Sequence, residues 1–234
     1  MIPLRSSLAT RHAPVITLLI IGINAYVYLK EFLLGPWGGQ RFLLYYGLIP
    51  CGLTGECQIV GRAFSQELTL FTSMFVHAGF FHVAGNMLYL WIFGNNVEDS
   101  MGKVRFAIFY LLCGLGAACA QILVSPASRV PMVGASGAIS GVLGAYLLLF
   151  PQARVLTLIP LGLFTQLAEI PAVIVLGFWI VIQLLNGLLT FNFEGAGVAW
   201  FAHIGGFAVG MILVGFFKRR WVPWGWQRHR VGYE

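Results

Sequence analysis

The sequence predicts an all-α membrane protein, a bundle of six transmembrane helices with a long first loop in the membrane interface. The first observation is composition: 59% of the 234 residues are hydrophobic and only 9% are charged, whereas soluble domains carry about 25% charged residues. The second is that the apolar residues gather in six segments, each close to the roughly 20 residues that a spanning helix needs. These segments are 14–34, 69–95, 104–124, 134–150, 168–190 and 198–217. We therefore expect residues 1–234 to form a single membrane domain.

The first apolar segment and the loop after it need separate arguments. Segment 14–34 is longer than the apolar core of a secretory signal peptide and is not followed by a small-residue cleavage site, so we expect a membrane helix. The loop of about 35 residues after it mixes apolar residues with glycines and prolines, which favours the interface over a flexible linker. It holds Cys51 and Cys57. An oxidising compartment permits a disulfide between them, but the sequence alone leaves the pairing open.

The basic residues orient the chain. The net charge of +6 does not indicate nucleic-acid binding, because Lys and Arg flank the apolar segments and do not form one patch. With the N-terminus inside, ten of them fall on inner segments, which predicts two cytoplasmic termini. The inner ten are Arg5, Arg11, Lys103, Arg105, Arg154, Lys218, Arg219, Arg220, Arg228 and Arg230, and the outer four are Lys30, Arg41, Arg62 and Arg129. Six membrane helices with only short tails predict a multi-pass membrane protein, and this compact organisation fits a bacterial cytoplasmic (inner) membrane.

A few strongly polar residues lie inside the apolar segments, where they are costly and count as functional candidates. They are His77, His82 and Asn86 in the second segment, Ser136 and Ser140 in the fourth, and His203 in the sixth. These three segments run from outside to inside. Ser136 and His203 lie about three and six residues below the outer ends, so their depths match at about 1.5 Å per residue. His82 and Asn86, four residues apart, share one helix face.

Small residues accompany both the serine and the histidine. Ser136 and Ser140 share a face with Gly137, Gly141 and Gly144, and His203 lies in a stripe with Ala199, Gly206 and Gly210. In a bilayer, such faces let two helix backbones approach closely. The pattern therefore predicts that the fourth and sixth segments touch and that Ser136 and His203 can form a hydrogen bond.

These residue types suit nucleophilic catalysis. A serine hydroxyl needs an adjacent base, and a neutral imidazole at His203 can take its proton and later pass it to a leaving amine. The developing oxyanion needs donors, which the backbone N–H near Ser136, the His82 ring and the Asn86 amide can supply. The sole aspartate of the chain, Asp99, lies on the inner side, so a Ser–His dyad is preferred to a triad.

Three motifs resemble those of the rhomboid family. The run from His77 through His82 to Asn86 resembles its HxxxxHxxxN pattern, and Gly134-Ala135-Ser136-Gly137 resembles its GxSG motif. Ala202-His203-Ile204-Gly205-Gly206 resembles its AHxxG motif, and Gly94, Glu98 and Gly102 resemble the family's loop after the second helix. The resemblance covers roughly residues 14–217 and is to the minimal six-helix bacterial form. GxSG alone is weak evidence, whereas three motifs in order on even-numbered helices are strong evidence.

The resemblance implies an intramembrane serine endopeptidase that cuts transmembrane segments of single-span or polytopic membrane proteins near their outer end. Ser136 would be the nucleophile and His203 the base, with His82 and Asn86 holding the oxyanion and no metal or organic cofactor. The fifth helix and the loop near Phe191–Trp200 would gate access. One departure affects His203: some members carry an aromatic residue against the catalytic ring where this chain has Ser140.

Each of these polar residues also has an interpretation without catalysis. Taken singly, a serine such as Ser136 is more often a packing residue, a histidine such as His203 is more often a hydrogen-bonded core residue, and Asn86 can simply tie two helices together. His77 is expected to be interfacial or structural and not catalytic, and Glu98 is expected to be a loop or helix-end partner of Lys103 or Arg105 and not an acid catalyst. The convergence of the polar residues at one depth argues against a purely structural explanation for all of them.

Three other functions remain as alternatives. A catalytically inactive rhomboid-like protein that binds membrane segments is disfavoured because Ser136 and His203 are both present. A transporter would show ionisable residues near the midplane or matched broken helices in a repeat. A metal site built from His77, His82 and His203 would need a further ligand or water.

Overall fold

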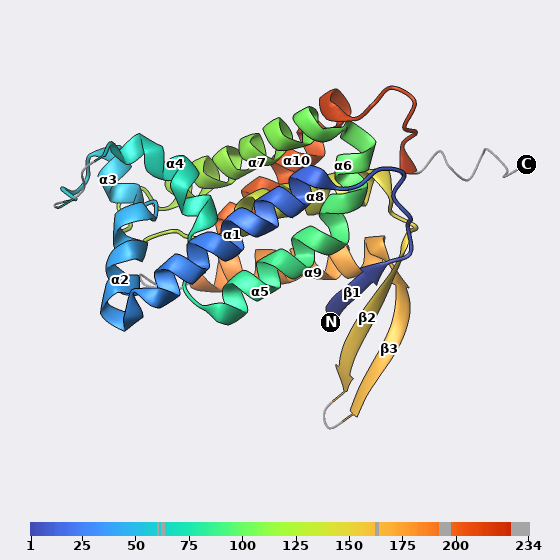
Figure 1. Ribbon diagram of the computed structural model, residues 1–234, viewed down its shortest axis with the longest axis horizontal. Helices are drawn as coiled ribbons and strands as arrows, with labels where there is room; N and C mark the ends of the chain where they lie inside the picture. The colour runs from blue at the N-terminus through green and yellow to red at the C-terminus, as the bar shows by residue number, and fades with distance from the viewer. Residues whose placement is uncertain (60, 62–63, 162–163, 192–197, 226–234) are drawn as a thin grey trace, which may run out of the picture.

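The computed structural model describes residues 1–59, 61, 64–161, 164–191 and 198–225. It is mostly helical, and Figure 1 shows the long helices side by side along the long axis of the molecule. In the described part, four helices are long and apolar enough to cross a membrane, and a bent pair makes a fifth span if it is counted as one. The four are α1 (Val15–Leu33), α7 (Lys103–Val124), α9 (Ala172–Thr190) and α10 (Trp200–Phe217).

The fourth expected segment is α8 (Ser136–Leu149), which has only 14 residues. At about 1.5 Å per residue it is about 21 Å long, shorter than the roughly 30 Å of a bilayer's apolar core. By length and composition the described residues therefore give four to five spans, and the expected count of six stays a prediction.

The second expected segment, 69–95, is not one continuous helix. Its outer part is a series of short turns: η1 (Gln66–Leu68), α4 (Thr69–Thr72) and η2 (Ser73–Phe75). The chain then becomes extended at Val76 and resumes as α5 (Phe80–Tyr89), a π-helical turn (Leu90–Gly94) and α6 (Asn95–Met101), bent by 79° from the outer part. The break leaves His77 outside helix α5, which carries His82 and Asn86, although the rings of His77 and His82 stay close, with their centroids 5.1 Å apart.

A three-stranded antiparallel sheet corrects the all-α expectation. Its strands, in order, are β1 (Ile2–Ser6), β2 (Arg154–Leu161) and β3 (Phe164–Pro171). Val155 pairs with Ser6 on one side and with Ile170 on the other. The expected fifth helix, 168–190, therefore begins later, at Ala172. Pro171 is the residue just before the first turn of α9. A proline at this place costs no helix hydrogen bond, because the first N–H groups of a helix have no partner within it.

The core is a three-helix contact in which α10 packs against both α7 and α8. Its glycines make this contact close, as the small-residue faces predicted. A Cβ atom added to Gly206 would collide with the backbone of Gly137, and one added to Gly210 would collide with the backbone of Gly141. The fourth and sixth segments are therefore held backbone to backbone beside Ser136 and His203.

The first loop folds at the end of the molecule opposite the sheet (Figure 1). It forms α2 (Gly35–Tyr46) and α3 (Pro50–Thr54), and a disulfide joins Cys51 to Cys57. The sequence had left this pairing open. Residues 35–59 of the loop thus have a defined conformation.

Glu98 has different partners from those expected. It is buried, and its carboxylate accepts hydrogen bonds from the backbone N–H groups of Ile16 and Thr17 and from the Thr17 hydroxyl, at 2.8–3.0 Å. These N–H groups belong to the first turn of α1, which has no partners for them within the helix. Glu98 therefore caps α1, and the expected pairing with Lys103 or Arg105 is wrong.

Candidate active site

Ser136 begins helix α8, and a glycine sets the turn before it. Gly134 has a φ of +116°, a left-handed conformation that favours glycine. A Cβ atom there would also come within 2.7 Å of the His82 Nε2 atom. The Gly134 N–H donates to the Ser73 carbonyl (2.9 Å), which ties the turn to the outer part of the second segment. The first glycine of the GxSG motif is thus required by both backbone conformation and space.

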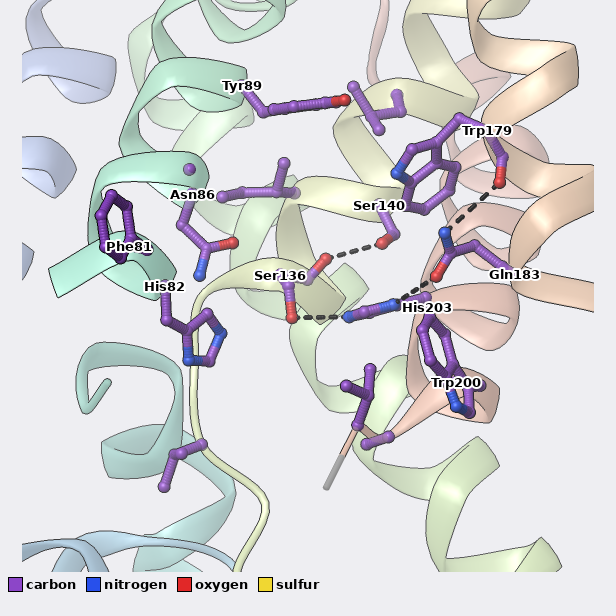
Figure 2. Close-up of a pocket in the computed structure, with 16 residues that line it drawn as sticks. Phe81, His82, Asn86, Tyr89, Ser136, Ser140, Trp179, Gln183, Trp200 and His203 are labelled. Carbon is purple, nitrogen blue, oxygen red and sulfur yellow. Dashed lines mark hydrogen bonds between the residues drawn. The ribbon is translucent and has the colours of Figure 1, made fainter. Parts of the chain in front are cut away.

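His203 lies in the first turn of α10 and faces Ser136 across the α8–α10 contact. Its Nε2 atom is 2.7 Å from the Ser136 Oγ atom, and its Nδ1 atom is 2.8 Å from Oε1 of Gln183 on α9 (Figure 2). The Gln183 amide nitrogen lies 3.3 Å from the Trp179 carbonyl oxygen. A hydrogen-bonded series therefore runs from α8 through α10 to α9.

His82 and Asn86 come from α5 and approach Ser136 from the opposite side (Figure 2). A Cβ atom at Gly134 would be 3.5 Å from the Asn86 amide nitrogen, so both side chains point at the turn just before Ser136. The Asn86 nitrogen is buried, and no hydrogen-bond partner for it exists among the described residues. A buried donor without a partner is costly in the resting protein.

All four predicted site residues line one cavity of about 400 Å³. The rest of the lining is largely apolar and aromatic and includes Phe81, Tyr89, Trp179 and Trp200. A cavity of this size with a few convergent polar groups is typical of a ligand site. The structure thus brings Ser136, His203, His82 and Asn86 together.

His77 and Ser140 make other contacts than the four predicted site residues that converge on the cavity. His77 is fully buried behind the turn. Its ring Nε2 atom accepts from the Ala135 N–H at 3.4 Å, and its backbone N–H faces the buried Glu31 carboxylate. These contacts support a structural interpretation of His77. The Ser140 hydroxyl lines the cavity but donates to the Ser136 carbonyl oxygen at 2.6 Å.

Sequence reasoning missed Gln183. It was a visible signal, because a glutamine in the middle of an apolar segment is as unusual as the histidines that were considered. It also missed the two tryptophans beside the His203 ring, Trp179 and Trp200, whose ring centroids are 6.0 and 6.2 Å from it. The gating loop falls partly outside the described residues, since 192–197 are not among them.

The metal alternative has no cluster to support it in the described part of the chain. No group of three or more His, Cys, Asp or Glu side chains there is arranged to hold an ion. His77 in particular faces the buried turn and not the cavity that holds His82 and His203.

Comparison with known proteins identifies the family. The family model described as "Rhomboid domain" matches residues 65–220. The chain belongs to the rhomboid family. Rhomboids are in general intramembrane proteases that act on membrane proteins within the bilayer, and the apolar helices agree with an integral membrane protein.

Three relatives illustrate the range of the match. RHOMBOID-like protein 1 of Arabidopsis thaliana is 35% identical over 67% of this chain and 38% of the relative. Rhomboid protein 1, mitochondrial, of Saccharomyces cerevisiae is 28% identical over 82% of this chain and 50% of the relative. Rhomboid protease GluP of Bacillus subtilis is 35% identical over 63% of this chain and 24% of the relative.

These coverages limit what the relatives say. The chain spans half or less of the length of these three proteins. They come from a plant, a yeast mitochondrion and a bacterium, so they do not support the bacterial cytoplasmic membrane over other membranes.

Proposed function

We propose that this rhomboid is an intramembrane serine endopeptidase in which Ser136 is the nucleophile and His203 is the general base. The observation that carries the proposal is the 2.7 Å contact between Ser136 Oγ and His203 Nε2, in a cavity that also holds the Asn86 amide nitrogen, for which the described residues offer no hydrogen-bond partner. A nucleophile, a base and an oxyanion donor thus lie around one space, which is the arrangement that acyl transfer needs.

The proposed chemistry has two steps. Ser136 Oγ attacks the scissile carbonyl carbon while its proton passes to His203 Nε2, and the carbonyl oxygen becomes an oxyanion near His82 and Asn86. When the intermediate collapses, the C–N bond breaks and His203 gives the proton to the leaving amine, which leaves an acyl-enzyme. Water then attacks the ester carbonyl carbon while His203 takes a proton from it. The bond between that carbon and Ser136 Oγ breaks, His203 returns the proton to Oγ, and the carboxylic acid product leaves.

The length of α8 supports cleavage within the membrane and near its outer side. A helix of 14 residues falls about 9 Å short of the bilayer's apolar core. Ser136 at its outer end would therefore lie below the outer surface, where a substrate helix must unwind to expose its backbone. We expect substrates to be membrane proteins whose spanning segments unwind easily near the outer end.

The proposed orientation has both termini on the inner, cytoplasmic side. β1 and the end of α10 lie at the same end of the molecule, opposite α2 and α3 (Figure 1). The same end carries Lys103, Arg105 and Arg219, and the excess of basic residues on inner segments favours this orientation. Arg228 and Arg230, which belong to the inner ten, fall outside the described residues.

The test uses purified protein in detergent with a generic single-span substrate. We expect the wild type to cut near the outer end of the substrate helix and Ser136→Ala and His203→Ala to lose that cut while staying folded. His12→Ala is the matched control, because His12 is exposed at the other end of the molecule, where it contacts Asp99. It should cleave like the wild type.

A fluorophosphonate probe separates the two remaining outcomes. If wild type and Ser136→Ala both fail to cut but only the wild type is labelled, the active site is present and the substrate offered was wrong. Absence of labelling in folded wild-type protein would contradict the proposal and would favour an inactive relative that binds membrane segments.

A further inference from the structure

We propose that Gln183 of α9 is a positioning residue for His203, holding its ring in the tautomer that can accept the Ser136 proton. The inference rests on the proposed function for its catalytic meaning, but the hydrogen-bond geometry behind it does not depend on catalysis. Gln183 is 5% exposed, so its amide has no ready access to solvent as an alternative partner.

The Gln183 amide has a defined orientation. Its Nε2 atom is 3.3 Å from the Trp179 carbonyl oxygen, which can only accept, so the amide nitrogen must face it. The amide oxygen then faces His203 Nδ1 at 2.8 Å. Reversing the amide would place its oxygen against the Trp179 carbonyl oxygen and its NH₂ group against the ring. The hydrogen-bond network therefore decides which terminal atom of the Gln183 amide is oxygen and which is nitrogen.

This orientation fixes the proton on His203. Because the Gln183 oxygen can only accept, Nδ1 of His203 must carry the hydrogen. In neutral imidazole the other nitrogen, Nε2, is then free of hydrogen and can accept from the Ser136 hydroxyl. The opposite tautomer would put a hydrogen on Nε2 and block proton transfer. Gln183 thus acts on His203 as an orienting group does in a triad, but without a charge.

The surroundings of the ring leave this task to α9 and the start of α10. The Ser140 hydroxyl donates to the Ser136 carbonyl, so it makes no contact that orients the ring. Trp179 lies beside the His203 ring with an interplanar angle of 39°, and Trp200 meets it edge-on at 87°. Aromatic walls restrict the tilt of the ring, but they do not distinguish its two nitrogen atoms. Of these neighbours, Gln183 is the one that does.

The direct test is spectroscopic and needs no enzyme activity. Nitrogen-15 chemical shifts of histidine report which ring nitrogen carries the hydrogen, and the His203 signal among the five histidines is the one lost in His203→Ala. We expect the Nδ1–H tautomer in the wild type. In Gln183→Met, which keeps the length of the side chain but removes the acceptor, we expect a mixture of tautomers. An Nε2–H tautomer in the wild type, or an unchanged spectrum in Gln183→Met, would overturn the proposal.

The kinetic test compares three variants on α9. In metal sites, loss of the group that orients a ligating histidine costs about 10–100-fold; we expect Gln183→Met to lower kcat by a similar factor with little change in KM. Gln183→Glu restores an acceptor and should recover most of the loss. Asn186→Leu is the matched control, because Asn186 donates to the Ile182 carbonyl (3.0 Å) and is not part of the cavity lining; it should cleave like the wild type.

The two proposals fail separately. Equal losses in Gln183→Met and Asn186→Leu, or no recovery in Gln183→Glu, would reduce Gln183 to a packing residue and leave the Ser136–His203 assignment intact. A wild type that is folded but neither cuts nor reacts with a fluorophosphonate would remove the proposed function, whereas its nitrogen-15 spectrum would still decide whether Gln183 sets the tautomer.

Discussion

The two walls of the cavity differ in how well their polar groups are satisfied. On the α8–α10–α9 wall, a series of hydrogen bonds runs from Ser136 through His203 and Gln183 to the Trp179 carbonyl. On the α5 wall, the buried Asn86 amide nitrogen lacks a hydrogen-bond partner within the described residues. The first wall is complete in the resting protein. The second holds a donor whose partner is absent, as expected of a group aimed at charge that develops only during reaction.

The two walls also differ in packing. On the first, helix backbones touch at Gly206 and Gly210, where an added Cβ atom would collide with α8. On the second, Gly85 lines the same cavity, and an added Cβ atom there meets nothing within 4 Å. Ser136 and His203, the proposed nucleophile and base, are thus held rigidly opposite a wall with space beside it, and the proposed substrate chain would lie in that space.

The largest effect expected on the α5 wall is catalytic. Asn86→Ala should lower kcat by about 10²–10³-fold, the usual cost of one oxyanion donor, while the free energy of unfolding does not fall. The reason is that the substitution removes a buried donor that is unpaired in the resting state. His82→Ala should act in the same direction. Steady-state cleavage and thermal unfolding in detergent measure the two quantities.

The outcome that breaks the comparison is a loss of stability without a loss of kcat. Asn86 would then be a structural tie between helices, which was one of the interpretations weighed from the sequence. The unpaired nitrogen would no longer indicate a site for developing charge.

The packing contrast predicts a smaller effect in a matched glycine pair. Gly206→Ala should lower the free energy of unfolding by about 1–3 kcal/mol, as overpacking does, because its Cβ atom would meet the Gly137 backbone. Gly85→Ala should be neutral or slightly stabilising, because its Cβ atom has space and alanine is the better helix former. Equal melting temperatures for the two variants would show that the α8–α10 contact can relax and that close packing does not hold the dyad.

Much of the candidate site was predictable from sequence because few strongly polar residues lie inside the apolar segments, where burying them in the membrane costs free energy. In an apolar segment, a histidine or a serine between glycines needs an explanation, and the spacing of Ser136 and His203 from the outer ends placed them at one depth. The same reasoning extended to His82 and Asn86. Gln183 also lies inside an apolar segment, but its amide is neutral and does not titrate, so it gives a weaker functional signal than a histidine. An amide oxygen can nevertheless accept from an imidazole N–H, as a carboxylate can.

The local breaks in regular structure were less predictable. Hydropathy gives one apolar run from 69 to 95, and nothing in that average reveals that the chain turns extended at Val76. Residues 154–171 form two strands because they pair with each other and with β1, far away in the sequence. The prediction for Glu98 was wrong for the same reason. Its partners lie 81 and 82 residues away in α1, whereas the predicted partners were its neighbours in sequence.

The inner end supplies a test of whether buried polar contacts affect catalysis wherever they lie. Glu98→Gln should lower the free energy of unfolding by about 1–3 kcal/mol, the range for a charged hydrogen-bonded group. One acceptor becomes an NH₂ group that faces the N–H donors of Ile16 or Thr17. We expect kcat to be unchanged when cleavage is measured well below the melting temperature. A fall in kcat at that temperature would mean that the α1 attachment is coupled to the cavity.

The smallest effect is expected at Ser140, which shares the first wall with Ser136 but not its role. Ser140→Ala removes one hydroxyl that donates to the Ser136 carbonyl four residues back. Such a bond inside a helix contributes about 1 kcal/mol or less, and the carbonyl also accepts the ordinary helix hydrogen bond. We therefore expect cleavage within a few-fold of wild type and a melting temperature close to it. Ser136→Ala, in contrast, should lose cleavage without losing stability. A large fall in kcat for Ser140→Ala with unchanged stability would mean that the orientation of the Ser136 backbone depends on this hydroxyl. The geometry of the α8–α10–α9 wall would then depend on Ser140 as well as on Gln183.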